Sequence, residues 1–90
     1  MSKYMIEGSM PGAGALSPAE LRIVSMVSNE ALATLSPRVK WQQSYVTDDK
    51  IFCVYIAANE DLVRKHAEQG GFPANRISRV RSTIDPTTAE

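Results

Sequence analysis

One histidine and one cysteine are the side chains of this sequence best suited to chemistry near neutral pH. His66 and Cys53 are each the only residue of their type among the 90 residues. An imidazole can move protons or bind a metal because its ordinary pKa lies near neutrality, so His66 is a candidate general base and metal ligand, or a histidine with a structural role only. Cys53 stands among apolar residues, which is typical of an inert buried thiol. Two soft ligands do not complete a metal site without further donors.

A second group of residues has the mixed polar and aromatic character of a small-molecule pocket. Strand alternation predicts that Trp41, Gln43 and Tyr45 share one face. Charged residues of the first and last predicted strands would complete such a pocket, with an arginine holding a ligand carboxylate through two hydrogen bonds. Packing between two subunits, or ion pairs in solvent, would account for the same residues without any ligand. The predicted pocket residues are Glu7, Trp41, Gln43, Tyr45, Arg79 and Arg81.

Length and composition limit the class of protein. Ninety residues are enough for one domain, spanning residues 1–90. Ten basic and ten acidic side chains cancel, which argues against a nucleic-acid partner because such proteins carry a basic surplus. No segment approaches the ~20 apolar residues of a membrane span, and residues 1–6 lack the apolar stretch of a signal peptide. We therefore expect a cytoplasmic protein with no membrane partner.

The first helix that must support these residues has a clear start. Ser17-Pro18-Ala19-Glu20 predicts a capped N-terminus, because Ser17 can accept a hydrogen bond from the free amides and Glu20 can bond back to the cap. The helix is expected to end near Ser36-Pro37, since the residue before a proline avoids helical geometry. Apolar residues at spacings of three and four predict its buried stripe, namely Leu21, Val24, Val27, Ala31 and Leu35.

Four other segments are typical of strands: residues 3–8, 39–46, 51–57 and 77–84. The sequence TDDK between the second and third segments predicts a hairpin turn. Asn59 predicts the cap of a second helix that ends at Gly70-Gly71. Its predicted inner stripe comprises Leu62 or Val63, His66 and Ala67. Residues 85–90 are expected to form a flexible tail.

The element order βαββαβ predicts an α+β, ferredoxin-like fold, with a four-stranded antiparallel sheet and two helices on one face. The third strand is apolar on both of its sides, whereas a strand with one face in water should alternate. A second copy packed on the uncovered face would hide these side chains, giving a homodimer of the dimeric α+β barrel type. A monomer whose tail or loops cover the sheet is the alternative. The two sides of this strand are Ile51, Cys53 and Tyr55 against Phe52, Val54 and Ile56.

Several segments also carry a family resemblance: residues 4–7 (YMIE), 44–55 (SYVTDDKIFCVY), 63–67 (VRKHA) and 71–77 (GFPANRI). They resemble a small bacterial family of domains of unknown function that is associated with a nickel-binding protein. The resemblance extends from Lys3 to Asp85 and implies a ferredoxin-like dimeric α+β barrel. It also implies that nickel or another divalent metal binds, with His66, Cys53 and Asp48 as the matching ligand positions and Tyr45 and Tyr55 beside them.

Three functions are compatible with these patterns. The first is a dimeric binding protein for a divalent metal such as nickel or for a small organic molecule in the barrel. The second is a cofactor-independent enzyme resembling small monooxygenases or isomerases, with His66 as general base and Trp41, Tyr45 and Arg79 holding the substrate. The third is a structural or regulatory interaction module.

Overall fold

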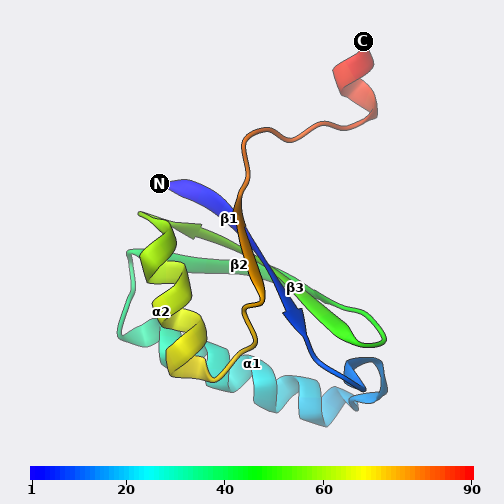
Figure 1. The fold of residues 1–90 in the computed structure, drawn as a ribbon, viewed down its shortest axis with the longest axis vertical. Coiled ribbons are helices and arrows are strands. Elements are labelled where there is room, and N and C mark those ends of the chain that lie inside the picture. Colours follow the sequence, from blue (N-terminus) through cyan, green and yellow to red (C-terminus); the bar gives the residue numbers. More distant parts are fainter.

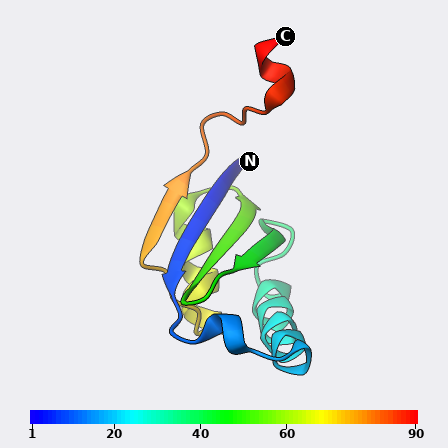
Figure 2. The ribbon, with the colours of Figure 1, turned by 90° about the vertical axis from the view of Figure 1, so that its right-hand side faces the viewer.

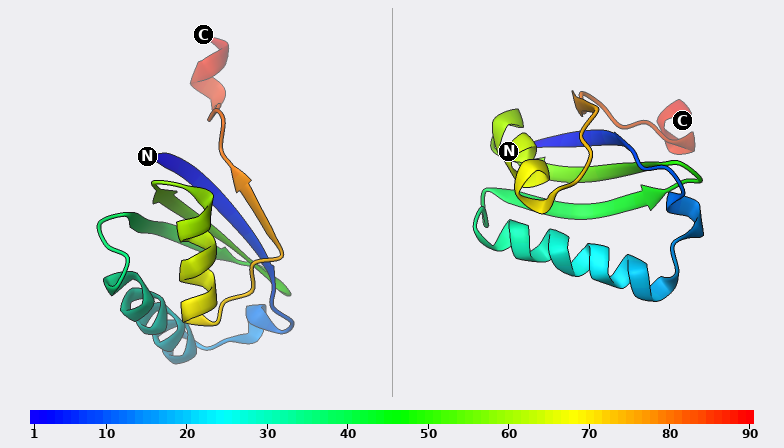
Figure 3. Two further views of the ribbon diagram at one scale, coloured as in Figure 1. Left: turned by 60° about the vertical axis from the view of Figure 1, so that its left-hand side comes forward. Right: turned by 60° about the horizontal axis from the view of Figure 1, so that its bottom comes forward.

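The structure, a computed structural model, describes residues 1–90 and has the element order βαββαβ, with two short 3-10 helices added. The four strands form one antiparallel sheet in the order β2-β3-β1-β4, and both helices lie on the same face of it (Figures 1 and 3). The predicted ferredoxin-like arrangement is confirmed. No helix combines the length and the apolar character needed to cross a membrane. The elements are β1 (Ser2–Ser9), η1 (Ala13–Ala15), α1 (Pro18–Ala33), β2 (Val39–Val46), β3 (Lys50–Ala57), α2 (Glu60–Gly70), β4 (Arg76–Arg79) and η2 (Pro86–Ala89).

Local sequence signals set the ends of both helices. The Ser17 hydroxyl accepts a hydrogen bond from the Glu20 amide at 3.1 Å, and the Glu20 carboxylate accepts one from the Ser17 amide at 2.9 Å. The predicted capping box is therefore confirmed at the start of α1. The Asn59 side chain accepts a hydrogen bond from the Leu62 amide at 3.0 Å at the start of α2. Gly71 ends α2 with φ of 69°, a left-handed conformation that glycine adopts without strain.

The hydrophobic core fills the space between the sheet and the two helices. Alternate residues of β1 and β3 point into it, and the inner stripe of α2 covers them. The predicted inward positions of α2 are confirmed, because Leu62, Val63, His66 and Ala67 are all buried. The core residues are Tyr4, Ile6, Leu35, Val39, Ile51, Cys53, Tyr55, Ala57, Leu62 and Val63.

The contact stripe of α1 differs from the prediction. Val27 was expected inside but is 40% exposed, and Ser28 is the buried residue of this helix at 3%. The helix is rotated so that the positions of Leu21, Val24 and Ser28 face the sheet. The buried position thus holds the polar side chain of Ser28, where the sequence pattern predicted an apolar residue.

A β-bulge in β2 decides which of its side chains share a face. Trp41 pairs with Tyr55, whereas Gln43 pairs with Val54, the neighbouring residue of β3. The extra residue at the bulge reverses the alternation. Trp41 therefore lies on the helix-covered face and Gln43 on the open face, and the prediction that they share a face is wrong.

The last strand is shorter than predicted, because its partner ends. Tyr4 pairs with Arg79, and the Val80 amide donates to the Lys3 carbonyl at 2.8 Å. Beyond this point β1 has almost no residues left to pair, so β4 cannot continue to residue 84. Residues 81–90 are all exposed. Residues 82–84 border a hollow on the open face together with Met5, Tyr45 and Val54, and the chain then leads away from the sheet to η2 (Figures 1 and 2).

The loop between β1 and α1 is fastened to the β2–β3 turn. The Met10 amide donates to the Asp49 carbonyl at 2.9 Å, and the Gly14 amide donates to the Asp48 carbonyl at 3.0 Å. The Asp49 carboxylate accepts a further bond from the Gly12 amide at 3.0 Å. A Cβ at Gly14 would lie 2.9 Å from the Asp48 Cα, so only glycine permits this approach. These bonds hold the loop beside the space between α1 and the sheet.

Candidate functional site

A cavity of about 220 Å³ lies between α1 and the helix-covered face of the sheet. Thirteen residues line it, from the β1–α1 loop, α1, β2, β3 and the segment after α2, and none of them carries a formal charge. We call it the α1–sheet cavity. Most of its lining is apolar, and its side chains with polar atoms are Ser25, Ser28, Trp41, Ser44, Cys53 and Tyr55.

The small side chains of α1 explain why the protein's own side chains do not fill this space. Interiors normally pack without voids larger than a water molecule, but α1 presents Ser25 and Ser28 toward the sheet. An apolar cavity of roughly 150 Å³ is known to hold benzene. The α1–sheet cavity is therefore large enough for one ring with small substituents. A charged ligand would lose its hydration without gaining a partner, which disfavours it strongly.

Three polar side chains meet at one wall of this cavity. Nε2 of His66 lies 3.0 Å from the Tyr55 hydroxyl oxygen and 3.4 Å from Oγ of Ser28. His66 is 0% exposed, and its ring meets the Tyr55 ring edge-on with centroids 5.0 Å apart. Ser28 and Tyr55 line the cavity, but His66 lies behind them in the core. We call these residues the Ser28–Tyr55–His66 cluster.

Burial keeps this wall of the cavity neutral. Burial lowers the pKa of His66 and so favours the uncharged imidazole. Burial also raises the pKa of the Tyr55 phenol, with a further contribution from Cys53. It likewise raises the pKa of the Cys53 thiol, which makes Cys53 a poor nucleophile. The cluster is therefore equipped for hydrogen bonding, and His66, behind its two hydroxyls, has no direct contact with a ligand in the cavity.

The three residues predicted as metal ligands are not gathered into one site. His66 and Cys53 are buried, whereas Asp48 is exposed at the β2–β3 turn. No group of three or more histidine, cysteine, aspartate or glutamate side chains is close enough to hold an ion. A protonated thiol and an imidazole already engaged through Nε2 are also poor ligands as they stand. The donors of a single chain do not fit a nickel site.

The six predicted pocket residues are likewise spread over the molecule. Trp41 lines the α1–sheet cavity, where its Nε1 donates to the Ser44 hydroxyl at 2.9 Å. Gln43 and Tyr45 lie on the open face of the sheet, and the Gln43 amide donates to the Tyr45 hydroxyl. The bulge described above separates these two groups.

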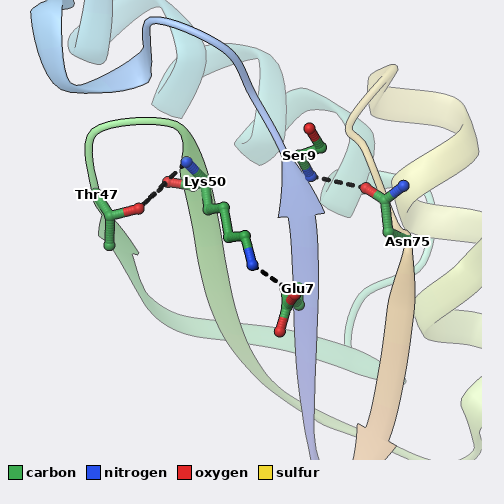
Figure 4. A network of polar contacts seen from close by, with 5 residues as sticks. All are labelled: Glu7, Ser9, Thr47, Lys50 and Asn75. Atoms are coloured by element: carbon green, nitrogen blue, oxygen red, sulfur yellow. Dashed lines mark hydrogen bonds and ion pairs between the residues drawn. The ribbon is translucent and has the colours of Figure 1, made fainter.

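The charged members of the predicted pocket do not face a common space. Glu7 lies on the open face, where its carboxylate is 3.2 Å from Nζ of Lys50 (Figure 4). Arg79 pairs with Tyr4 at the edge of the sheet and is exposed, and Arg81 is exposed beyond the end of β4. Within one chain, neither arginine faces a pocket in which it could hold a ligand carboxylate.

The open face of the sheet is apolar at its centre. The strand register places Met5, Phe52, Val54 and Ile56 on this face together with Tyr45. Met5 and Tyr45 are 40% and 54% exposed. The prediction that β3 is apolar on both sides is thus confirmed, and no helix covers the second side.

Sequence reasoning missed Ser28 and Ser44 as lining residues. One signal was present for Ser28, which follows Leu21 and Val24 at the spacing of the inward stripe. A serine in such a stripe needs a partner inside the core, and His66 was the only imidazole available. Ser44 had no comparable signal because its face depends on the bulge.

Comparison with known proteins agrees with this fold. The crystal structure of SCO4226 from Streptomyces coelicolor A3(2) is similar with a TM-score of 0.77 and 16% sequence identity, over 92% of this chain and 100% of that chain. At this identity the likeness shows the fold alone. No curated protein sequence matches the chain. The family model described as "Nickel responsive protein SCO4226-like" matches residues 4–80, and the chain therefore belongs to this SCO4226-like family.

Proposed function

We propose that this protein binds a small, uncharged and mainly apolar organic molecule in the α1–sheet cavity. The observation that carries the proposal is a cavity of about 220 Å³ without a charged lining residue, next to a buried set of hydrogen-bonding groups. Ligand sites are typically apolar spaces with a few convergent polar groups. The Ser28–Tyr55–His66 cluster would orient the ligand, and the surrounding apolar side chains would provide most of the binding energy.

We further propose that the protein works as a homodimer in the cytoplasm, with the open faces of two sheets packed together. The support is the apolar centre of that face, where the ring of Tyr45 and the thioether of Met5 are exposed beside the half-buried Phe52 and the buried Val54. Large exposed apolar patches usually mark contact surfaces. The single buried thiol of Cys53 suits a reducing compartment.

Nickel binding is a second candidate function, and membership of the SCO4226-like family supports it. The donors of one chain do not fit a nickel ion, so a site would need donors from a second subunit. Nickel titration by calorimetry of the wild type and of His66→Ala tests this candidate. Heat of binding in the wild type that is lost in the variant would assign a role to His66. No heat above buffer in either protein would eliminate the metal candidate.

The cavity proposal is tested by the fluorescence of Trp41, the only tryptophan of the chain and part of the cavity lining. We expect titration with toluene to change its emission to saturation. Benzoate, which adds a charge to a similar ring, is expected to have no effect. Unchanged emission with toluene would contradict the proposal.

A pair of variants shows whether the toluene site is the α1–sheet cavity. Ser25 lines this cavity, so Ser25→Leu fills part of it and is expected to weaken toluene binding. Arg22 is exposed on the same helix, and Arg22→Leu is the matched control that should leave binding unchanged. Equal binding by both variants would place toluene elsewhere.

A further inference from the structure

The position of one proton in the Ser28–Tyr55–His66 cluster follows from the surroundings of the imidazole. Nδ1 of His66 is buried and has no hydrogen-bond partner, whereas Nε2 faces two hydroxyl oxygens at 3.0 and 3.4 Å. A neutral imidazole has a single N–H. A buried N–H without an acceptor is rarer in proteins than a buried acceptor without a donor. The proton of His66 therefore belongs on Nε2, where it has acceptors.

This tautomer determines whether the hydroxyls of Tyr55 and Ser28 can donate a hydrogen bond to a ligand in the cavity. If Nε2–H donates to the oxygens of Tyr55 and Ser28, the proton of each hydroxyl stays free for another acceptor. Both oxygens contact the same nitrogen, so the two hydroxyls lie side by side. The other acceptors next to these protons are the Cys53 thiol and the neighbouring hydroxyl of the pair itself, because Tyr55 contacts both Cys53 and Ser28. The thiol is only a weak acceptor, and a ligand carbonyl oxygen would take the place of either partner.

Two of the other polar groups of the cavity have their donors already engaged. The Ser25 hydroxyl donates to the Leu21 carbonyl one turn earlier in α1, at 2.9 Å. The indole N–H of Trp41 donates to the Ser44 hydroxyl. The Ser44 hydroxyl accepts this bond and keeps its own proton, but it is a single hydroxyl beside the Cys53 thiol. Ser28 and Tyr55 instead present two hydroxyls next to one another, both held by the same imidazole nitrogen.

We propose that the α1–sheet cavity selects neutral carbonyl compounds with one ring, such as aryl ketones, because the Ser28 and Tyr55 hydroxyls donate to the carbonyl oxygen. This inference rests on the proposed function of the cavity. The volume of about 220 Å³ limits the ligand to about one substituted ring. The absence of charge in the lining excludes carboxylates and amines. His66 is a positioning residue, which fixes the direction of both hydroxyl protons.

The test compares acetophenone with α-methylstyrene, in which a CH₂ group replaces the carbonyl oxygen. Dissociation constants are measured by NMR titration of backbone amides, on the wild type and on Tyr55→Phe, Ser28→Ala and Ser25→Ala. We expect the preference for acetophenone over α-methylstyrene to fall roughly 3- to 10-fold in Tyr55→Phe, the effect of one net hydrogen bond. A similar fall is expected in Ser28→Ala, and no change in Ser25→Ala, whose hydroxyl proton is already used by the backbone.

The outcomes separate the two proposals. If both compounds bind but neither Tyr55→Phe nor Ser28→Ala changes the preference, the carbonyl inference is overturned and the cavity function stands. If neither compound binds the wild type, both proposals are overturned. Ser28→Ala keeps the test valid should Tyr55→Phe fail to fold.

The tautomer itself has an independent readout. His66 is the only histidine, so a long-range ¹H–¹⁵N correlation spectrum shows one imidazole without ambiguity. We expect the pattern of the Nε2–H tautomer. A pattern of the Nδ1–H tautomer, or of a charged imidazole at pH 7, would overturn the argument.

Discussion

The two faces of the sheet show how the same strands serve two different surroundings. On β1, Tyr4 and Ile6 point toward the helices and are 6% and 3% exposed, whereas Met5 between them lies on the open face at 40%. The helix-covered face encloses an uncharged cavity, and the open face carries an apolar centre with an ion pair beside it. The first arrangement suits a small ligand, and the second suits a large flat partner such as another sheet.

The bulge in β2 shows how the division between the faces is made. Without the extra residue, Trp41 and Tyr45 would lie on the same side of the sheet. With it, Trp41 joins the cavity and Tyr45 joins the open face. One local irregularity thus assigns two large aromatic side chains to two different roles.

The largest expected effect is a difference in unfolding free energy between substitutions on the two faces of the sheet. Ile51 is 5% exposed within the core, and Ile56 of the same strand is half-buried on the open face. We expect Ile51→Ala to reduce the free energy of unfolding by about 2–5 kcal/mol, and Ile56→Ala by roughly 1 kcal/mol or less in the dilute monomer. Urea unfolding measures both. Equal losses would mean that the open face is as well packed as the core.

A charge introduced on the open face should prevent dimer formation, whereas a charge on the helix side should not. We expect wild type to sediment at twice the 9.9 kDa of the chain and Phe52→Lys at the single mass, because a buried unpaired charge is strongly unfavourable in an interface. The dimer should weaken more than about a hundredfold. Ile23→Lys is the control, since Ile23 is 60% exposed on α1, away from the sheet's open face. A monomeric wild type would refute the dimer.

The pH dependence of stability should report on the helix-covered face. The folded pKa of His66 is lowered by burial, so below pH 6.5 the unfolded chain binds more protons than the folded one. The stability that neutral His66 provides is fully present above pH 6.5 and is lost as the pH falls. We expect a slope of at most about 1.4 kcal/mol per pH unit from this one group.

Urea midpoints between pH 5.5 and 7.5 measure this slope in the wild type and in His66→Gln. The variant lacks the titrating imidazole, so its stability should vary less over this range. The same slope in both proteins would mean that His66 is not held neutral by the fold.

The smallest expected effect concerns the ion pair on the open face. The side chains of Lys50 and Glu7 are 53% and 38% exposed (Figure 4), and pairs of this kind contribute little in water. We expect Lys50→Ala to change the free energy of unfolding by less than about 1 kcal/mol. Thermal unfolding at low and high salt measures the change. A larger loss of unfolding free energy would mean that the ion pair on the open face stabilises the fold, in contrast to the weak packing expected there.

The fold was predictable because its signals are local. The capping box at Ser17, the cap at Asn59 and the left-handed Gly71 each act within a few residues. The apolar character of both sides of β3 was also visible in the sequence, because strand alternation needs no knowledge of partners. These features fixed the element order and the existence of two apolar sheet faces.

The candidate site was less predictable because it depends on contacts between distant segments. The bulge that turns Trp41 inward is a property of the β2–β3 pairing, and the rotation of α1 that buries Ser28 depends on packing against the sheet. The predicted metal ligands are not gathered within one chain, for a related reason. Positions carried over from a family pattern do not by themselves place Asp48 near His66.

The most direct test of the proposed binding site is to locate a small bound ligand in the protein. Isotope-filtered NOE spectra of the complex with toluene reveal which side chains touch its methyl group and ring. We expect contacts with the rings of Trp41 and Tyr55, on the helix-covered face. Contacts with Tyr45 and Phe52 instead would place the ligand on the open face and contradict the division of roles between the two sides of the sheet.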